Sequence, residues 1–339
     1  MRRLYPLNII LFSIFIVSCA QPATQNIISP ISYTFPAGVV APDAIAIDVS
    51  GNIWVLGQAG DVAEINPAGT IITTYSLPSG NGGLTSYAGI AIAASGNIWA
   101  VNYAGGFVAR LVPYTNTVQT YSTGFGPYGV AIDNSGNIWV GDTGTGSTPY
   151  SSITELVGSN LYYSSYGNTV SQDCVESVAI DGLGYTWLSG CGSVYILDTS
   201  AKVTGSYTFS SGGPGNIAID QNENAWVVDT NALYLLSPPN NPVLMYADNR
   251  SIFQGIAIDR AGNVWVTDAA NANLFEFNPS GTTLNIFSTG NNPGGVAIDV
   301  YGNVWVANTN DNTITEWVNV AMGPQYFPYT GPQFPGGQP

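Results

Sequence analysis

Carboxylates recur at fixed places in a repeated motif of this 339-residue chain, and their spacing is the first feature that could support chemistry. One set ends the segment Ile-Ala-Ile-Asp or a close variant: Asp48, Asp133, Asp181, Asp220, Asp259 and Asp299, with Ala93 in the second copy. Six aligned carboxylates could gather around a metal ion. In most copies, however, a Gly-Asn pair follows three residues later, and Asp at that offset bonds the backbone of a turn. We therefore interpret this set as caps of tight hairpins.

Two further sets share a position. The first lies three residues after a recurring tryptophan and comprises Asp142, Asp229 and Asp268, with Asn102 and Asn308 at the matching offset. Such oxygens could hold Ca²⁺, Mg²⁺ or a polar ligand, although turn formation explains the same pattern and the metal stays unassigned. The second comprises Glu64, Glu155, Glu276 and Glu316, with Arg110 in the second copy. For this second set we predict a solvated strand surface and no catalytic role.

The composition excludes several classes of function. The chain has no histidine, which removes His-based general acid–base catalysis, Ser-His-Asp triads and His-liganded zinc or haem. Six Lys and Arg stand against 21 Asp and Glu, for a net charge of -15. Because phosphate backbones would repel such a chain, we expect no nucleic-acid partner.

Seven copies of one motif must position these residues. They span Ala44 to Val55, Gly89 to Ala100, Gly129 to Val140, Ser177 to Leu188, Asn216 to Val227, Gly255 to Val266 and Gly295 to Val306. Their tryptophans are Trp54, Trp99, Trp139, Trp187, Trp226, Trp265 and Trp305, spaced 39 to 48 residues apart. A period near 40 with short β-rich segments predicts an all-β fold, a seven-bladed β-propeller.

Each blade reads as four strands, A to D, with Ile-Ala-Ile as strand A and Ile-Trp-Val as strand B. The central residue of strand A is alanine in every copy, which suits the crowded axis, and we expect each tryptophan to fill the wedge between neighbouring blades. The last blade lacks its own strand D. Residues 31–35 contain Thr, Tyr and Phe, residue types that also recur in the strand D segments of the other blades. We therefore predict that this N-terminal strand completes the last blade and closes the ring.

The first residues resemble an export signal. Arg2 and Arg3 precede a short apolar run, and Ile-Val-Ser-Cys ends it at Cys19, as in the bacterial lipobox. We predict a lipoprotein signal peptide over 1–18, a tether over 19–29, the propeller over 30–320 and a Pro/Gly-rich disordered tail over 321–339. Lipid on Cys19 would anchor an exported bacterial lipoprotein to a membrane, in the periplasm or at the cell surface.

Two departures from the repeat mark one rim of the channel. Cys174 precedes strand A of the fourth blade and Cys191 follows its strand B, so we predict a disulfide in an oxidising compartment. Extra residues lie between strands B and C of the third blade and before Cys174. Tyr150, Tyr163 and Tyr166 add aromatic surface there, and with Asp142, Asp229, Asp268 and Asn308 they form the predicted binding rim; neutral drift of the loops is the alternative.

The motif Gly-Ile-Ala-Ile-Asp-x-x-Gly-Asn-Val-Trp-Val-x-Asp, at Gly255 to Asp268, resembles the NHL repeat and the repeats of virginiamycin B lyase-like (streptogramin lyase-like) proteins. The resemblance covers about residues 30 to 320 and implies a propeller. Streptogramin lyases use a catalytic histidine and magnesium, and this chain has no histidine to match. Gluconolactonase-like propellers use a carboxylate/Asn metal site, which has no residue-by-residue match here.

These observations favour a binding or scaffold module over an enzyme. We expect an envelope-anchored monomer that binds a peptide, glycan or protein partner through one rim of the channel. The alternatives are a metal-dependent lyase or lactonase using Ca²⁺ or Mg²⁺, and a passive cell-surface component. No catalytic residue is assigned.

Overall fold

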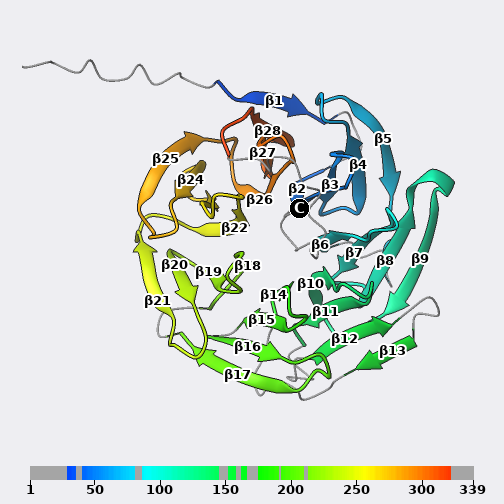
Figure 1. The fold of residues 1–339 in the computed structure, drawn as a ribbon. Helices are drawn as coiled ribbons and strands as arrows, with labels where there is room; N and C mark the ends of the chain where they lie inside the picture. The colour runs from blue at the N-terminus through cyan, green and yellow to red at the C-terminus, as the bar shows by residue number, and fades with distance from the viewer. Residues whose placement is uncertain are drawn as a thin grey trace, which may run out of the picture.

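The computed structural model describes residues 29–35, 40–80, 86–144, 152–157, 162–165, 175–190, 192–209 and 213–321. Within them, seven four-stranded antiparallel sheets surround a central opening, as Figure 1 shows. This confirms the predicted seven-bladed propeller. No helix in these ranges is long and apolar enough to cross a membrane. One 3-10 turn, Pro113–Thr115, lies between strands C and D of the second blade.

The strands are ordered from the axis outward. Strands A, innermost, are β2 (Pro42–Ile47), β6 (Tyr87–Ile92), β10 (Pro127–Ile132), β14 (Ser177–Ile180), β18 (Ile217–Ile219), β22 (Phe253–Ile258) and β26 (Pro293–Ile298). Strands B are β3 (Ile53–Gly57), β7 (Ile98–Asn102), β11 (Ile138–Asp142), β15 (Thr186–Gly190), β19 (Ala225–Asp229), β23 (Val264–Asp268) and β27 (Val304–Asn308).

The outer two strands follow the same order. Strands C are β4 (Asp61–Ile65), β8 (Phe107–Val112), β12 (Ser152–Val157), β16 (Ser193–Leu197), β20 (Ala232–Leu236), β24 (Asn273–Phe277) and β28 (Thr313–Trp317). Strands D are β5 (Ile71–Ser76), β9 (Thr117–Ser122), β13 (Tyr162–Ser165), β17 (Val203–Thr208), β21 (Val243–Ala247), β25 (Thr283–Ser288) and, from the N-terminal side, β1 (Ile31–Thr34). The alternation of half-buried and exposed residues in β5, β17 and β25 is typical of a sheet edge with one face in solvent.

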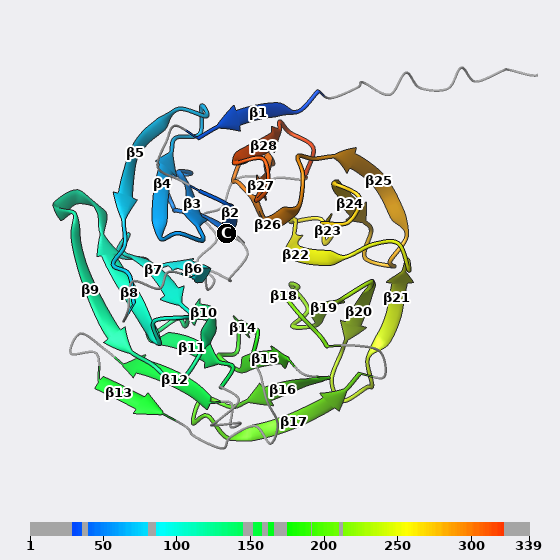
Figure 2. The same cartoon turned by 180° about the vertical axis from the view of Figure 1, so that it is seen from behind.

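The seventh sheet contains strands from both ends of the chain. Its order is β1-β28-β27-β26, and β1 pairs antiparallel with β28 so that Tyr33 lies opposite Ile314. Tyr33 also donates a hydrogen bond to the carboxylate of Glu316 at 2.7 Å and stacks on Trp305 at 5.8 Å. The first strand therefore lies where the sequence predicts it, beside β28 in Figures 1 and 2. That this pairing holds the ring shut stays a prediction.

The hydrophobic core lies between the blades. Trp54 of the first blade packs with Ile90 and Ile98 of the second, and Trp305 of the seventh packs with Ile45 and Val55 of the first. All seven repeat tryptophans are at most 3% exposed and belong to such clusters. This confirms the wedge packing. Each blade therefore covers an apolar face of its neighbour.

The Asp after strand A caps its hairpin, as predicted. Asp48 accepts the backbone N–H groups of Ser50 and Asn52, both at 2.9 Å, and its second oxygen accepts the indole N–H of Trp54 at 3.1 Å. The same contact joins the Asp and Trp of the other five Asp-bearing blades, at 2.9 to 3.4 Å. These carboxylates therefore bind backbone and indole groups of their own blade.

The second blade replaces this arrangement by another. Ala93 cannot accept the indole N–H, and Arg110 of strand C lies over the Trp99 ring at 6.0 Å. With the amide oxygen of Asn97 turned toward it, Arg110 also donates to that oxygen at 2.9 Å. The second blade thus differs from the others at two positions, Ala93 and Arg110. The Arg110 guanidinium lies over Trp99 in this blade, whereas the other blades have an Asp that accepts the indole N–H.

The prediction that the strand C glutamates lie on a solvated surface is wrong. Glu64, Glu155, Glu276 and Glu316 are between 4% and 8% exposed. The Asn52 amide donates to Glu64 at 3.1 Å, and Asn263 donates to Glu276 at 3.2 Å. Residues of the outer strand contact this position, since Tyr75 donates to Glu64, Asn285 to Glu276 and Tyr33 to Glu316. The sequence of one strand does not reveal this cover, and burial raises the pKa of all three glutamates.

Candidate functional site

The polar residues that end strand B are buried. Asn102, Asp142, Asp268 and Asn308 are 0% exposed, and Asp229 is 2% exposed. Their side chains hold nearby loops: Asp268 accepts the backbone N–H groups of Ile252 and Ala270, and Asn102 accepts that of Gly105. These contacts are those expected of turn-forming residues. Because their side chains are buried, these five residues do not form a ring of oxygens open to the channel rim.

Asp142 and Asn308 have nearly the same surroundings in two blades. One oxygen of Asp142 accepts the hydroxyls of Ser152 and Thr154, at 2.9 and 2.8 Å, and Thr154 in turn accepts the backbone N–H of Gly124 at 3.3 Å. The Asn308 amide instead donates to two hydroxyls on β28 and accepts a backbone N–H. The other oxygen of Asp142 is buried with no hydrogen-bond partner, and burial raises its pKa to about 6.

Other predicted residues lie outside what the structure describes. Cys19, Cys174, Cys191, Tyr150 and Tyr166 are among the residues left out, and Tyr163 lies in β13, whose backbone alone is described. Lipidation, the disulfide and the aromatic part of the rim therefore stay predictions. The same holds for the signal peptide, the tether and nearly all of the tail.

A cavity at one end of the central channel is the strongest candidate site among the described residues. Its volume is about 350 Å³, within the range of small-molecule sites, and it is lined by the first residues of the seven A strands. The loops from D to A and from B to C meet at this end, where the Tyr103 N–H donates to the Ser86 carbonyl at 2.8 Å. It is the end on which the sequence places the binding rim.

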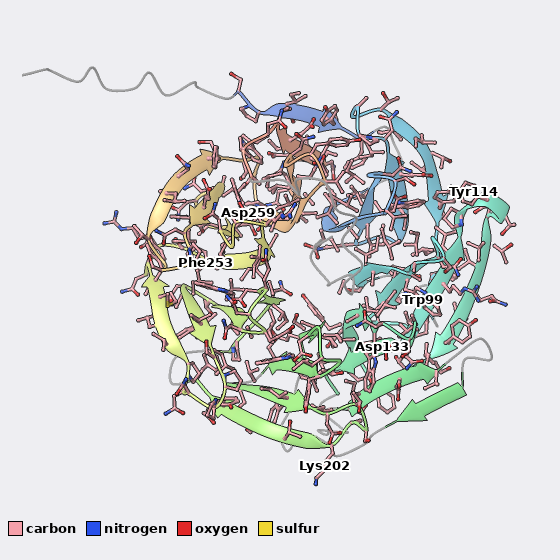
Figure 3. All side chains as sticks on the ribbon, in the orientation of Figure 1. Trp99, Tyr114, Asp133, Lys202, Phe253 and Asp259 are labelled. Atoms are coloured by element: carbon pink, nitrogen blue, oxygen red, sulfur yellow. The ribbon has the colours of Figure 1, made fainter. Side chains whose placement is uncertain are left out.

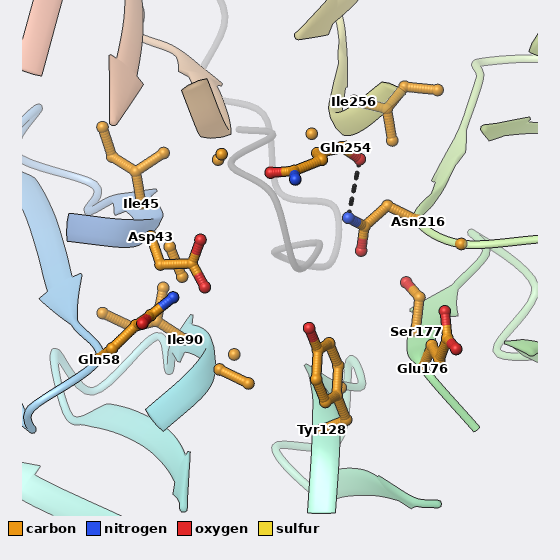
Figure 4. Close-up of a pocket in the computed structure, with 18 of the residues that line it drawn as sticks. Asp43, Ile45, Gln58, Ile90, Tyr128, Glu176, Ser177, Asn216, Gln254 and Ile256 are labelled. Atoms are coloured by element: carbon orange, nitrogen blue, oxygen red, sulfur yellow. Dashed lines mark hydrogen bonds between the residues drawn. The ribbon is translucent and has the colours of Figure 1, made fainter. Parts of the chain in front are cut away.

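The polar groups of the cavity come from different blades. Figure 4 shows Asp43, Tyr128 and Gln254 directed toward a common space from β2, β10 and β22, and Glu176, the residue before β14, lines the cavity beside Ser177. The Asn216 amide donates to the Gln254 carbonyl at 2.8 Å. The cavity therefore offers two carboxylates, a phenol and amide groups to a ligand.

Sequence analysis missed these residues, although a signal for them exists. They lie two positions before the recurring Ile or Val of strand A, where the seven copies read Asp43, Ala88, Tyr128, Glu176, Gly215, Gln254 and Gly294. The rest of the motif hardly varies, whereas this position changes in size and charge from copy to copy. A position that breaks an otherwise regular repeat at the channel is a candidate for specific recognition.

The next position is Gly, Ala or Ser in six of the seven copies, with Asn216 in the fifth, because neighbouring A strands approach closely around the axis. A Cβ on Gly129 would lie 2.9 Å from the backbone nitrogen of Val178, and one on Gly89 would lie 2.7 Å from the Tyr128 carbonyl oxygen. Both distances are shorter than van der Waals contact. The small residues therefore set the strand spacing, and the variable position beside them sets the chemistry of the wall.

Surrounding protein perturbs the ionisable groups of the cavity. Burial raises the pKa of Asp43, an effect that hydrogen bonds from Gln58 and Thr309 oppose. Burial likewise raises the pKa of Glu176, whose side chain contacts solvent in the channel. The pKa of Tyr128 rises through burial and through the negative charges of Asp43 and Glu176. Burial therefore disfavours the charged form of all three groups, and at Tyr128 the two carboxylates add to the effect.

An exposed aromatic cluster borders the cavity. Tyr103 and Tyr128 are each 42% exposed and meet edge to face at 6.2 Å, and Phe125 in the adjacent loop is 60% exposed. Large apolar surfaces left open beside a polar cavity are typical of ligand sites. By contrast, Tyr114 and Lys202 project from the outer perimeter in Figure 3, far from the channel.

The residues present do not fit a metal centre. Within the described ranges no group of three or more His, Cys, Asp or Glu side chains lies close enough to hold a metal ion. Of the cavity carboxylates, Asp43 and Glu176 belong to blades three apart in a ring of seven. The described residues therefore offer no set of ligands for the magnesium that the resemblance implies.

No family profile matches the sequence, and no curated protein matches it. The structure is similar to selenomethionine-substituted virginiamycin B lyase from Staphylococcus aureus, with a TM-score of 0.73 and 15% identity, covering 85% of this chain and 98% of that one. A catalytically inactive variant of that lyase with quinupristin gives a TM-score of 0.74 at 15% identity, covering 85% and 98% of the two chains. Kuenenia stuttgartiensis hydrazine synthase gives 0.73 at 13% identity, covering 84% and 97%. At such identities the likeness shows the fold alone. It confirms that this chain has the propeller fold of virginiamycin B lyase.

Proposed function

We propose that the protein is a binding module whose ligand enters the channel at the end where the D–A and B–C loops meet. The cavity of about 350 Å³, lined at a position whose size and charge vary among the seven copies, carries this proposal. Its size suits a small molecule or the terminal unit of a peptide or glycan. The solvent-exposed aromatic cluster of Tyr103, Phe125 and Tyr128 supplies contact surface beside it.

The enzyme alternative is not favoured. A lyase or lactonase needs a proton-transfer group and an electrophile placed together on the substrate. Histidine is absent from the chain, and the described carboxylates do not converge in a metal-binding set. The two carboxylates of the cavity stand on separate walls, which suits ligand contacts on both sides.

Blocking the cavity tests the proposal. Ala88 lines the channel wall, so Ala88→Trp should fill much of the opening, while Ser206→Trp places the same side chain on the exposed face of β17 as a matched control. Purified proteins are incubated with envelope extract, washed by filtration and eluted for mass spectrometry of small molecules. We expect a compound retained by wild type and by Ser206→Trp and lost from Ala88→Trp; equal retention by all three would refute the channel as the site.

We also propose that the protein is exported and held at the bacterial envelope through lipid on Cys19. The lipobox-like sequence before Cys19 supports this location, and a binding channel at a membrane surface would meet molecules of the envelope. Cell fractionation of wild type and Cys19→Ala provides the test. The wild-type chain should sediment with membranes and the variant should not; identical fractionation would refute anchoring.

A further inference from the structure

Two carboxylates line the cavity from distant blades. Asp43 belongs to the first blade and Glu176 to the fourth, three steps apart in a ring of seven, so they approach the axis from nearly opposite sides (Figure 4). No lysine or arginine is among the described residues that line the cavity. The negative charge of these two walls is therefore not neutralised by a cation of the protein.

An aromatic wall lies between the two carboxylates. Tyr128, from the third blade, points its hydroxyl into the cavity, and its ring is held edge to face against Tyr103. The pKa of its phenol is raised by the charge of both Asp43 and Glu176, so both carboxylates act on this ring. A cation near an aromatic face is attracted by its π electrons, and the same face offers apolar contact to a carbon chain.

We propose that the cavity binds an aliphatic diamine or polyamine, with one ammonium group at Asp43, another at Glu176 and the carbon chain along Tyr128. This rests on the proposed function and adds the class of ligand. Each ammonium group donates charge-assisted hydrogen bonds, and it compensates a carboxylate that burial disfavours when charged. A flexible chain with a charge at each end suits carboxylates that come from different walls of the cavity.

Calorimetric titration with three probes that share a five-carbon chain separates the effect of charge from that of the carbon chain. The probes are cadaverine, pentylamine and pentanediol, which carry two, one and no positive charges. We expect cadaverine to bind with one-to-one stoichiometry and about tenfold or more tighter than pentylamine, because one charged hydrogen-bonded contact is lost in the monoamine. Pentanediol should give no binding heat. Equal affinity for cadaverine and pentanediol, or no binding of cadaverine, would overturn the proposal.

Variants assign the contacts. Asp43→Asn and Glu176→Gln should each weaken cadaverine binding about tenfold or more. Tyr128→Leu should weaken it as well, whereas Tyr128→Phe keeps the ring and should bind nearly as wild type. Glu223→Gln is the matched control, since Glu223 accepts the Gly182 N–H at 2.9 Å in the hairpins at the other end of the propeller. If Glu223→Gln weakens binding as much as Glu176→Gln, the attraction is that of net charge and the assignment to the cavity fails.

The two proposals fail in different ways. If cadaverine does not bind but an envelope compound is still lost on Ala88→Trp, the channel remains a binding site and the amine class is wrong. If cadaverine binds and Ala88→Trp leaves its affinity unchanged, the amine lies outside the cavity and the amine proposal is wrong, whereas the channel as a binding site is refuted only by equal retention of envelope compounds in all three proteins.

Discussion

Replacing Asp142 by asparagine should stabilise the protein at neutral pH. One oxygen of Asp142 has no hydrogen-bond partner, and its pKa is raised from 3.8 to about 6 by burial. Asn308 shows that an amide fits this position, since it accepts a backbone N–H and donates to two hydroxyls. In the variant, the amide would accept from Gly124 and donate to Ser152 and Thr154 in the same way.

The magnitude and the sign follow from the raised pKa of Asp142. Between pH 4 and 6 the folded state binds more protons at this carboxyl than the unfolded state, so the stability contributed by the group falls as the pH rises. A shift of roughly two units corresponds to about 3 kcal/mol at 1.36 kcal/mol per unit. Asp142→Asn should therefore be more stable than wild type by about 1–3 kcal/mol at pH 7, and similar to it near pH 4.

Urea denaturation at pH 4 and pH 7, followed by tryptophan fluorescence, measures this difference. Asn308→Asp is the reciprocal control, because it places a carboxyl among the same kinds of partners in the seventh blade. It should destabilise at pH 7 and much less at pH 4. The reasoning is refuted if Asp142→Asn changes the free energy of unfolding equally at both pH values, or lowers it at pH 7.

Four other perturbations test the fold. Trp226→Ala should cost about 3–5 kcal/mol, since this ring is 1% exposed between two blades, and an unchanged melting temperature would contradict the wedge packing. Deleting residues 20–36 removes β1 and leaves β28 as an open edge, so we expect unfolding or aggregation; a monomer with wild-type stability would exclude a closing role. Ala93→Asp gives the indole of the second blade the acceptor present in six others and should stabilise by about 0.5–1.5 kcal/mol in thermal denaturation. Cys174 and Cys191 should be unreactive toward a thiol reagent in unreduced exported protein, and two reactive thiols would rule out their disulfide.

Much of the fold can be predicted from short stretches of the sequence. The hairpin after strand A depends on Asp48, Gly51 and Asn52, whose turn chemistry acts within five residues, and seven such units at a regular period leave few alternatives to a ring. The tryptophan wedge follows from the same repetition, because one large residue beside one small alanine must pack against the next unit. These features could be predicted since each depends on contacts within a blade or between identical neighbours.

The candidate site depends on contacts that no single repeat contains. Asp43, Tyr128 and Glu176 are separated by tens of residues and come together only because the ring brings the start of every A strand to one opening. Glu64 is predicted in solvent and is buried, and Tyr75 of the outer strand donates a hydrogen bond to it. Local patterns specify which elements form, whereas burial and the convergence of side chains depend on how the blades pack around the axis. For this reason the sequence determined the propeller, and the tertiary structure alone decided which residues line its cavity.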